Sequence, residues 1–193
     1  MDALGRKEIA ARLKTLTAKN STTGDQLTKY VYGTTLANSD VASNDLLRAI
    51  IYPDSDDADS PLGNGADGVY DRVELKYNRL GDTKEKKDQL STVHTYEYDT
   101  LGRLTQDRVT ALGSGVDNAA KRVSRTYEVR GMVQKITSYD NSTVGQGTVL
   151  NEVQFEYNNF AQLTNEYQEH GGAVNTSTSP KVQYAYANAS ANH

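Results

Sequence analysis

The 193-residue sequence has no cysteine and no tryptophan, and it contains only two phenylalanines, two methionines and three prolines. Without cysteine, disulfides and thiolate metal sites are excluded. The scarcity of large apolar side chains argues against a thick, sealed core, although 13 tyrosines partly compensate. A tyrosine combines an apolar ring with a polar tip, so it suits a thin sheet that stays in reach of water. The composition therefore predicts a shallow, partly hydrated core.

A strong charge of one sign is also missing. The chain carries 25 acidic and 21 basic side chains, mixed along the sequence, with a formal net charge of −4. No basic stripe is available for a phosphate backbone, so nucleic acid is not an expected partner. No apolar run approaches the roughly 18 residues of a membrane span, and residues 1–6 lack the apolar region of a signal peptide. We therefore expect no membrane span, and the sequence itself carries no localisation signal.

Motifs that assemble a catalytic or cofactor site are absent as well. The three histidines, His94, His170 and His193, are scattered, and there is no HExxH, GxSxG or P-loop pattern. Residues 63–68 match GxGxxG, but a strand-like stretch follows where a dinucleotide site needs a helix. These glycines are interpreted as turn residues. The sequence predicts no enzyme, no catalytic residue, no cofactor and no metal.

One acidic segment, residues 54–68, leaves a weaker alternative open. Its aspartates could converge on Ca²⁺, which takes oxygen ligands from flexible loops. Their spacing does not give an EF-hand loop, because Ala58 stands where a ligand is needed and no glutamate closes the segment. We interpret the segment as a solvated acidic insertion. The aspartates concerned are Asp54, Asp56, Asp57, Asp59 and Asp67.

The most informative stretch runs from Tyr96 to Thr105 and reads YEYDTLGRLT. Tyr96 and Tyr98 are two residues apart and therefore lie on one face of a strand. Asp99 can accept hydrogen bonds from the backbone ahead of it, and Gly102 permits the backbone conformation at which a chain reverses. This stretch predicts a β-hairpin.

The pattern recurs along the chain, and we call Tyr98 and its counterpart in each copy the anchor. Two positions before each anchor stands a mostly apolar or aromatic residue, and the residue between the two is mostly polar. This period of two is typical of half-buried antiparallel strands. When copies are aligned on Tyr98, its counterparts are Tyr32, Tyr77, Val129, Tyr157 and Tyr186. We expect the pairs Tyr30/Tyr32, Leu75/Tyr77, Tyr96/Tyr98, Phe155/Tyr157 and Tyr184/Tyr186 on the packed face, and Glu97, Glu128 and Glu156 on the solvent face. In this alignment Val133 and Ala161 replace the turn glycine, so those turns are expected to be less tight.

These residues resemble the YxYDxxGRL signature of YD repeats, the unit of RHS (rearrangement hot spot) proteins. The resemblance implies an all-β chain of antiparallel hairpin repeats that forms a strip of a rolled, shell-like sheet. In this family the shell surrounds a toxic or variable C-terminal domain, and relatives mediate contact at the cell surface. The family's autoproteolytic aspartates find no match, so no proteolytic activity is implied. The residues that carry the motif are Tyr96, Tyr98, Asp99, Gly102, Arg103 and Leu104, with Asp2, Gly5, Arg6, Tyr77, Gly81, Tyr157 and Leu163 in other copies.

The resemblance implies a single repeat segment over residues 1–193. It consists of a truncated hairpin at 1–18, repeats near 27–53, 69–89, 90–110, 121–139, 151–169 and 180–193, and the acidic loop at 54–68. Residues 7–18 also suit an amphipathic helix, so strand and helix both stay open there. Because the first and last copies each lack a strand, we expect the end hairpins to fray or self-associate.

The function implied by the resemblance is that of a structural segment of a larger bacterial surface or secreted protein. Its partners would be neighbouring RHS repeats of a longer chain. The alternative is a carbohydrate-binding or adhesion module, since exposed tyrosines can stack on sugar rings. Arg103 and Arg6 have a structural explanation, because an arginine in the turn can lie over a neighbouring tyrosine ring or donate to turn carbonyls.

Overall fold

The computed structural model describes residues 13–19, 21–22 and 24–187, and in this part every regular element is a β-strand. The expected all-β, antiparallel architecture is confirmed. Of the segment left open between strand and helix, Thr15–Ala18 is a strand. The first motif copy, with Asp2, Gly5 and Arg6, lies outside the described residues. The chain divides into two compact units, residues 1–91 and 92–193.

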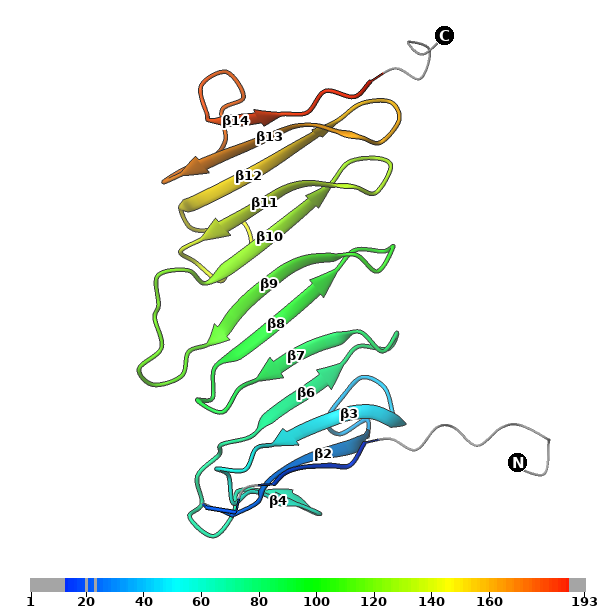
Figure 1. The fold of residues 1–193 in the computed structure, drawn as a ribbon, viewed down its shortest axis with the longest axis vertical. Coiled ribbons are helices and arrows are strands. Elements are labelled where there is room, and N and C mark those ends of the chain that lie inside the picture. The colour runs from blue at the N-terminus through cyan, green and yellow to red at the C-terminus, as the bar shows by residue number, and fades with distance from the viewer. Residues whose placement is uncertain (1–12, 20, 23, 188–193) are drawn as a thin grey trace, which may run out of the picture. The chain divides into compact units, whose positions relative to one another are not determined.

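The first unit is an antiparallel sheet with a small hairpin beside it (Figure 1). The strand order in its sheet is β1-β2-β3-β6-β7, and β4 and β5 pair only with each other. The strands are β1 (Thr15–Ala18), β2 (Gln26–Thr34), β3 (Ser43–Ile51), β4 (Ala58–Asp59), β5 (Leu62–Gly63), β6 (Val73–Tyr77) and β7 (Thr83–Lys87).

The second unit is a meander in which each strand pairs antiparallel with the next along the chain (Figure 1). Short turns can make such pairs because antiparallel neighbours need no crossover. The strands are β8 (Val93–Tyr98), β9 (Leu104–Ala111), β10 (Arg122–Tyr127), β11 (Val133–Tyr139), β12 (Val149–Tyr157), β13 (Leu163–His170) and β14 (Lys181–Gln183).

Burial does not follow the expected alternation. In the second unit the cross-strand register places Glu97 on the same face as Arg122, Thr137 and Glu152, which are 3%, 5% and 5% exposed. Tyr96, Tyr98, Phe155 and Tyr157, on the opposite face, are only half-buried, and Tyr184 and Tyr186 are 40% and 46% exposed. The prediction that the tyrosine face is the buried one is therefore wrong for this unit.

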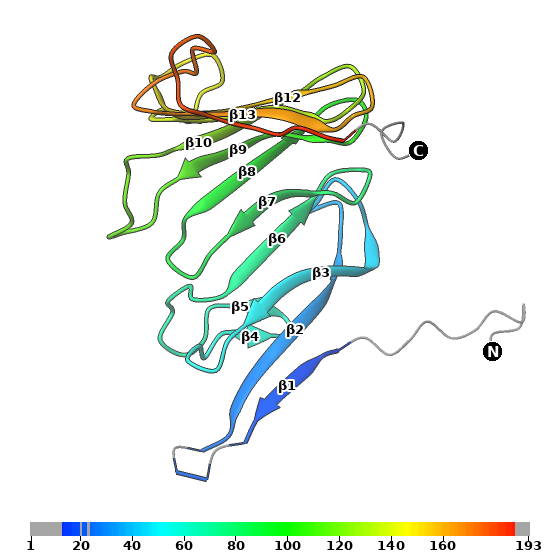
Figure 2. The ribbon, with the colours of Figure 1, turned by 45° about the horizontal axis from the view of Figure 1, so that its top comes forward.

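Long loops explain the difference. Arg122 donates to the carbonyls of Thr143 and Gln146 in the loop after β11. Glu152 accepts a hydrogen bond of 3.1 Å from the Val174 N–H in the loop after β13. Through these hydrogen bonds both loops cover the glutamate face, and Figure 2 shows the backbone of the two loops at one end of the strands. Because the sheet is a single layer, these loops supply the cover that a second layer would supply elsewhere.

The first unit has a comparable arrangement. Ala49 and Ile51 are 0% and 2% exposed, and they share a face with Glu74 rather than with the tyrosines. The segment from β4 to β6 covers this face, through the contact of Arg72 with Glu74 and Asp57. Tyr77, at 7% exposed, is the one tyrosine anchor that the prediction placed correctly in a buried position.

Candidate functional site

The turn of the best motif copy is fixed by one carboxylate and one glycine. The Gly102 N–H donates to the Asp99 carbonyl at 3.0 Å, and Gly102 adopts a φ of 77°. Asp99 Oδ1 accepts the N–H groups of Leu101 and Arg103 at 2.9 and 3.0 Å, and its Oδ2 accepts Arg103 Nε at 2.7 Å. These backbone and side-chain hydrogen bonds from Arg103 lower the pKa of Asp99. Asp99 and Gly102 thus play the parts that the sequence assigned to them.

Three other hairpins close with the same geometry. Their carbonyl acceptors are Asn78, Glu128 and Asn158, and the matching N–H donors are Gly81, Gly131 and Ala161, at 3.1, 2.9 and 3.0 Å. The expectation of looser turns in the degenerate copies is wrong. Ala161 accepts the strained left-handed conformation, with a φ of 63°, to keep the turn.

The hairpin that turns at Glu128 corrects the alignment of the repeats. Val129 lies in the turn and is fully exposed, so it is not the counterpart of Tyr98. That counterpart is Tyr127, which ends β10 and is followed by Glu128 in the place of Asp99. Gly131, with a φ of 93°, is the turn glycine, whereas Val133 takes the place of Leu104. Glu128 is accordingly a turn residue and not a strand residue on a solvent face.

A β-bulge follows each of these turns at the same position. Tyr98 lies opposite Leu104 while Glu97 lies opposite Gln106, which leaves Thr105 as the extra residue. The register shifts in the same way next to Tyr77, Tyr127 and Tyr157. The Thr105 hydroxyl donates to the Glu97 carbonyl at 3.0 Å. A bulge twists the hairpin locally and re-aims its side chains.

The tyrosine at this position connects successive hairpins. Its hydroxyl donates to the carbonyl of the residue that lies opposite the equivalent tyrosine of the preceding hairpin. We call this set of hydrogen bonds the tyrosine ladder. Its described members are Tyr77 to Leu47 at 2.6 Å, and Tyr127 to Leu104, Tyr157 to Val133 and Tyr186 to Leu163 at 2.8 Å each. The cross-strand partners that define the acceptors are Tyr32 with Leu47, Tyr98 with Leu104, Tyr127 with Val133 and Tyr157 with Leu163.

The tyrosine ladder explains why tyrosine rather than phenylalanine stands at the anchor. A half-buried hydroxyl needs a hydrogen-bond partner, and the carbonyl beside the bulge offers one. Burial alone raises the pKa of Tyr77, and burial together with the Glu128 carboxylate raises that of Tyr157. Both hydroxyls therefore stay protonated, and remain donors, well above neutral pH.

Arg103 joins its own turn to the next hairpin. Its guanidinium lies 2.6 Å from Asp99 Oδ2, and its Cζ lies 4.4 Å from the centroid of the Tyr127 ring. The expected position over a neighbouring tyrosine ring is thus present, whereas the turn acceptor is a carboxylate rather than a carbonyl. Arg130 makes a comparable link, since it pairs with Glu128 at 2.7 Å and donates to the Asn158 carbonyl at 2.8 Å.

The acidic loop is organised by internal contacts. Asp57 is 2% exposed and pairs with Arg72 at 2.6 Å, so the interpretation of a solvated insertion is wrong for this residue. Asp56 Oδ2 accepts the Ala66 N–H at 2.6 Å. In the described ranges no group of three or more histidine or acidic side chains could hold a metal ion, which leaves the calcium alternative without support. Gly68, with a φ of 73°, is a turn glycine and is followed by strand β6.

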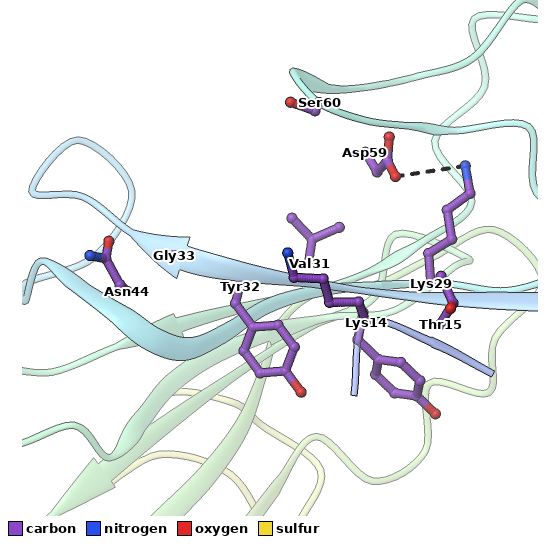
Figure 3. A pocket seen from close by; sticks show the side chains of 10 residues that line it. Lys14, Thr15, Lys29, Val31, Tyr32, Gly33, Asn44, Asp59 and Ser60 are labelled. Atoms are coloured by element: carbon purple, nitrogen blue, oxygen red, sulfur yellow. Dashed lines mark ion pairs between the residues drawn. The ribbon is translucent and has the colours of Figure 1, made fainter. Parts of the chain in front are cut away.

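Among the hollows that described residues line, two have a volume typical of small-ligand sites. One, of about 570 Å³, lies beside β2 in the first unit and is lined by Lys14, Lys29, Tyr32 and Asp59 among others. Figure 3 shows Lys29 reaching toward Asp59, 3.9 Å away, while Tyr32 points to the opposite side of the strand. The other, of about 360 Å³, lies in the second unit and is lined by Phe155, Tyr157, Glu128, Glu156, Arg130, Gln134 and Thr164.

Among the histidines that the sequence singled out, His94 lies in a pair. Its Nδ1 is 2.6 Å from Asp107 Oδ1, and its ring stacks on that of Tyr96 with centroids 6.3 Å apart. Across the described residues, no helix is long and apolar enough to cross a membrane.

Among known proteins, the chain is similar to chains of solved structures. No family model and no curated protein matches the chain. A chain in the solved structure described as "Crystal Structure of TcdB2-TccC3-TEV" is similar, with 12% sequence identity and a TM-score of 0.31. The similarity covers 91% of this chain and 11% of that one.

Proposed function

We propose that this chain is a non-enzymatic strip of antiparallel hairpins within a larger RHS-like protein, at the bacterial cell surface or secreted. The strip would build part of a β-shell that encloses or presents a toxic or variable C-terminal domain. The observation that carries this proposal is the tyrosine ladder, in which Tyr127, Tyr157 and Tyr186 each link their hairpin to the one before it by the same kind of hydrogen bond.

A shell wall needs extent and regular joints more than it needs a thick core. The second unit meets this need with a single-layer meander, in which buried side chains are mostly polar and are held by loops. The joints are partly hydrogen bonds and partly the Arg103 contact with Tyr127. Such a wall is stabilised chiefly by its nearest-neighbour contacts, as in other repeat arrays.

The test is protection of a downstream domain. The protein would be produced with its native flanking sequence and digested with a protease, with the C-terminal part followed by mass spectrometry. The double variant Tyr127→Phe/Tyr157→Phe removes two hydrogen bonds of the ladder and keeps both rings, so it should speed digestion of the enclosed part. Tyr139→Phe is the matched control, because its ring stacks under Arg122 at 3.9 Å in the same sheet without a ladder bond. Equal digestion of the C-terminal part with and without the strip would refute the proposal.

Carbohydrate binding is a second candidate, and it is favoured by the hollow at Phe155 and Tyr157. Two aromatic rings beside the carboxylates of Glu128 and Glu156 combine stacking surface with hydrogen-bond acceptors. Binding should be weak, insensitive to a chelator and lost in Tyr157→Ala but kept in Tyr139→Ala. A glycan panel titrated with and without chelator tests this, and a signal that depends on a divalent metal and on Asp56 would contradict it.

A further inference from the structure

The dipeptide Asn64-Gly65 follows β5 and lies among charged side chains. In such a pair the backbone nitrogen of the glycine can attack the asparagine carboxamide, because no Cβ obstructs its approach. Only glycine fits here, since a Cβ on residue 65 would lie 2.1 to 2.3 Å from atoms of Asp56. The fold therefore requires the sequence that is chemically most prone to cyclise.

Three contacts bear on this chemistry. Arg72 donates to Asn64 Oδ1 at 3.0 Å, which polarises the carboxamide carbonyl. The Gly65 N–H donates to Asp57 Oδ1 at 3.1 Å, so a carboxylate sits at the nucleophile. The same Asp57 is 2% exposed and pairs with Arg72 at 2.6 Å through Oδ2, which holds both groups in place. A donor thus faces the electrophile's oxygen and an acceptor faces the nucleophile's hydrogen, as assisted acyl transfer requires.

We propose that Asn64 is a self-catalysed deamidation site, with Asp57 as general base and Arg72 as the group that stabilises the oxyanion. Asp57 takes the proton of the Gly65 amide as its nitrogen bonds to Asn64 Cγ, and the Arg72 guanidinium donates to the oxyanion formed at Oδ1. The Cγ–Nδ2 bond then breaks, ammonia leaves with a proton from water, and Asp57 returns its proton to solvent. Water opens the resulting succinimide to aspartate or isoaspartate, so the net change is gain of water and loss of ammonia.

The modification would change the loop that covers the first unit's sheet. Asn64 Nδ2 donates to the Gly68 carbonyl at 3.0 Å, and this bond is lost when the amide becomes a carboxylate. The new negative charge would join Asp57 and Glu74 around the single Arg72. The product should therefore hold the β4–β5 hairpin less firmly than the original amide does.

The decisive comparison is between the folded and the urea-unfolded chain near neutral pH, with peptide mapping of Asn64 over time. Folding normally protects asparagine, whereas assistance by Asp57 and Arg72 should make Asn64 react at least about 10-fold faster in the folded chain. Asn141 is the internal reference, because it precedes Ser142 and its Oδ1 accepts the Thr143 N–H at 2.8 Å. Its deamidation should be slower in the folded chain than in the unfolded chain. If Asn64 deamidates no faster in the folded chain than in the unfolded chain, the proposal is overturned, and no variant is needed for this test.

Variants locate the base. Asp57→Asn should lower the rate of Asn64 deamidation in the folded chain to the rate in the unfolded chain. The rate should then rise tenfold per pH unit, as expected when hydroxide removes the proton of the Gly65 amide. Asp59, two residues after Asp57, is exposed and lies 3.9 Å from Lys29. Asp59→Ala should therefore leave the rate of Asn64 deamidation and its pH dependence unchanged. If both variants behave alike, Asp57 is not the base and the proposal fails.

Discussion

Replacing Tyr127 by phenylalanine removes one hydroxyl and leaves the ring under Arg103 in place. The Leu104 carbonyl, which accepts this hydroxyl at 2.8 Å, then loses its partner in a half-buried position. Losing such a hydrogen bond costs about 1 kcal/mol of unfolding free energy, and more where water cannot replace the donor. Tyr127→Ala should cost about 2 kcal/mol beyond that, because it also removes the ring and the cation–π contact at 4.4 Å.

Urea denaturation of the whole chain measures these costs, with hydrogen exchange to locate them. The loss in Tyr127→Phe should appear as faster exchange where β9 meets β10, since the hydroxyl spans these two strands. Tyr157→Phe should have a similar cost at the junction of β11 and β12, where the acceptor is Val133 at 2.8 Å. Tyr139→Phe should stay within about 0.5 kcal/mol. If Tyr127→Phe and Tyr139→Phe have the same midpoint, the tyrosine ladder does not stabilise the sheet.

Three further outcomes can be measured in the same way. Gly131→Ala should lower the free energy of unfolding by about 1 kcal/mol and Ala161→Gly should raise it by a comparable amount, because both positions hold a positive φ. Urea midpoints equal to that of the unchanged chain would contradict this. Arg72→Ala should cost about 3 kcal/mol or more, since it leaves the buried Asp57 unpaired, while Lys84→Ala, which breaks the exposed pair with Asp40, should stay within about 0.5 kcal/mol. The pKa of Asp99 is lower in the folded chain, so its stabilisation is present above about pH 4 and is lost as the pH falls through the folded value. Asp99→Asn should therefore flatten the acid limb of the stability curve, whereas an unchanged limb would rule out this carboxylate as a source.

The fold class and the best turn could be predicted because they depend on local rules. A period of two specifies strands, and the Asp99 and Gly102 positions follow from the hydrogen bonds and the positive φ that a reversal needs. The error at Val129 came from aligning that copy on tyrosines rather than on glycine. Gly131 is the stricter marker, because few other residues accept its φ of 93°.

The covered face could not be predicted from the same pattern. The loops after β11 and β13 contain few apolar residues, so nothing local indicates which side of the sheet they cover. Their contacts with Arg122 and Glu152 join residues about 20 positions apart in sequence. The pairing of Asp57 with Arg72 is likewise non-local. The many neighbouring aspartates led to a single interpretation for the whole segment, so the sequence did not distinguish Asp57 from the exposed ones.

The tyrosine ladder has a direction, and this direction restricts how such an array can grow. The donor is always a side chain of the later hairpin, whereas the acceptor is a backbone carbonyl of the earlier one. Every residue supplies a carbonyl, so the earlier hairpin can vary its residue at the acceptor, as Leu104, Val133 and Leu163 illustrate. The later hairpin must carry a tyrosine. Insertion of a foreign hairpin should thus be tolerated or rejected according to its own anchor residue, whatever the sequence of the hairpin that precedes it.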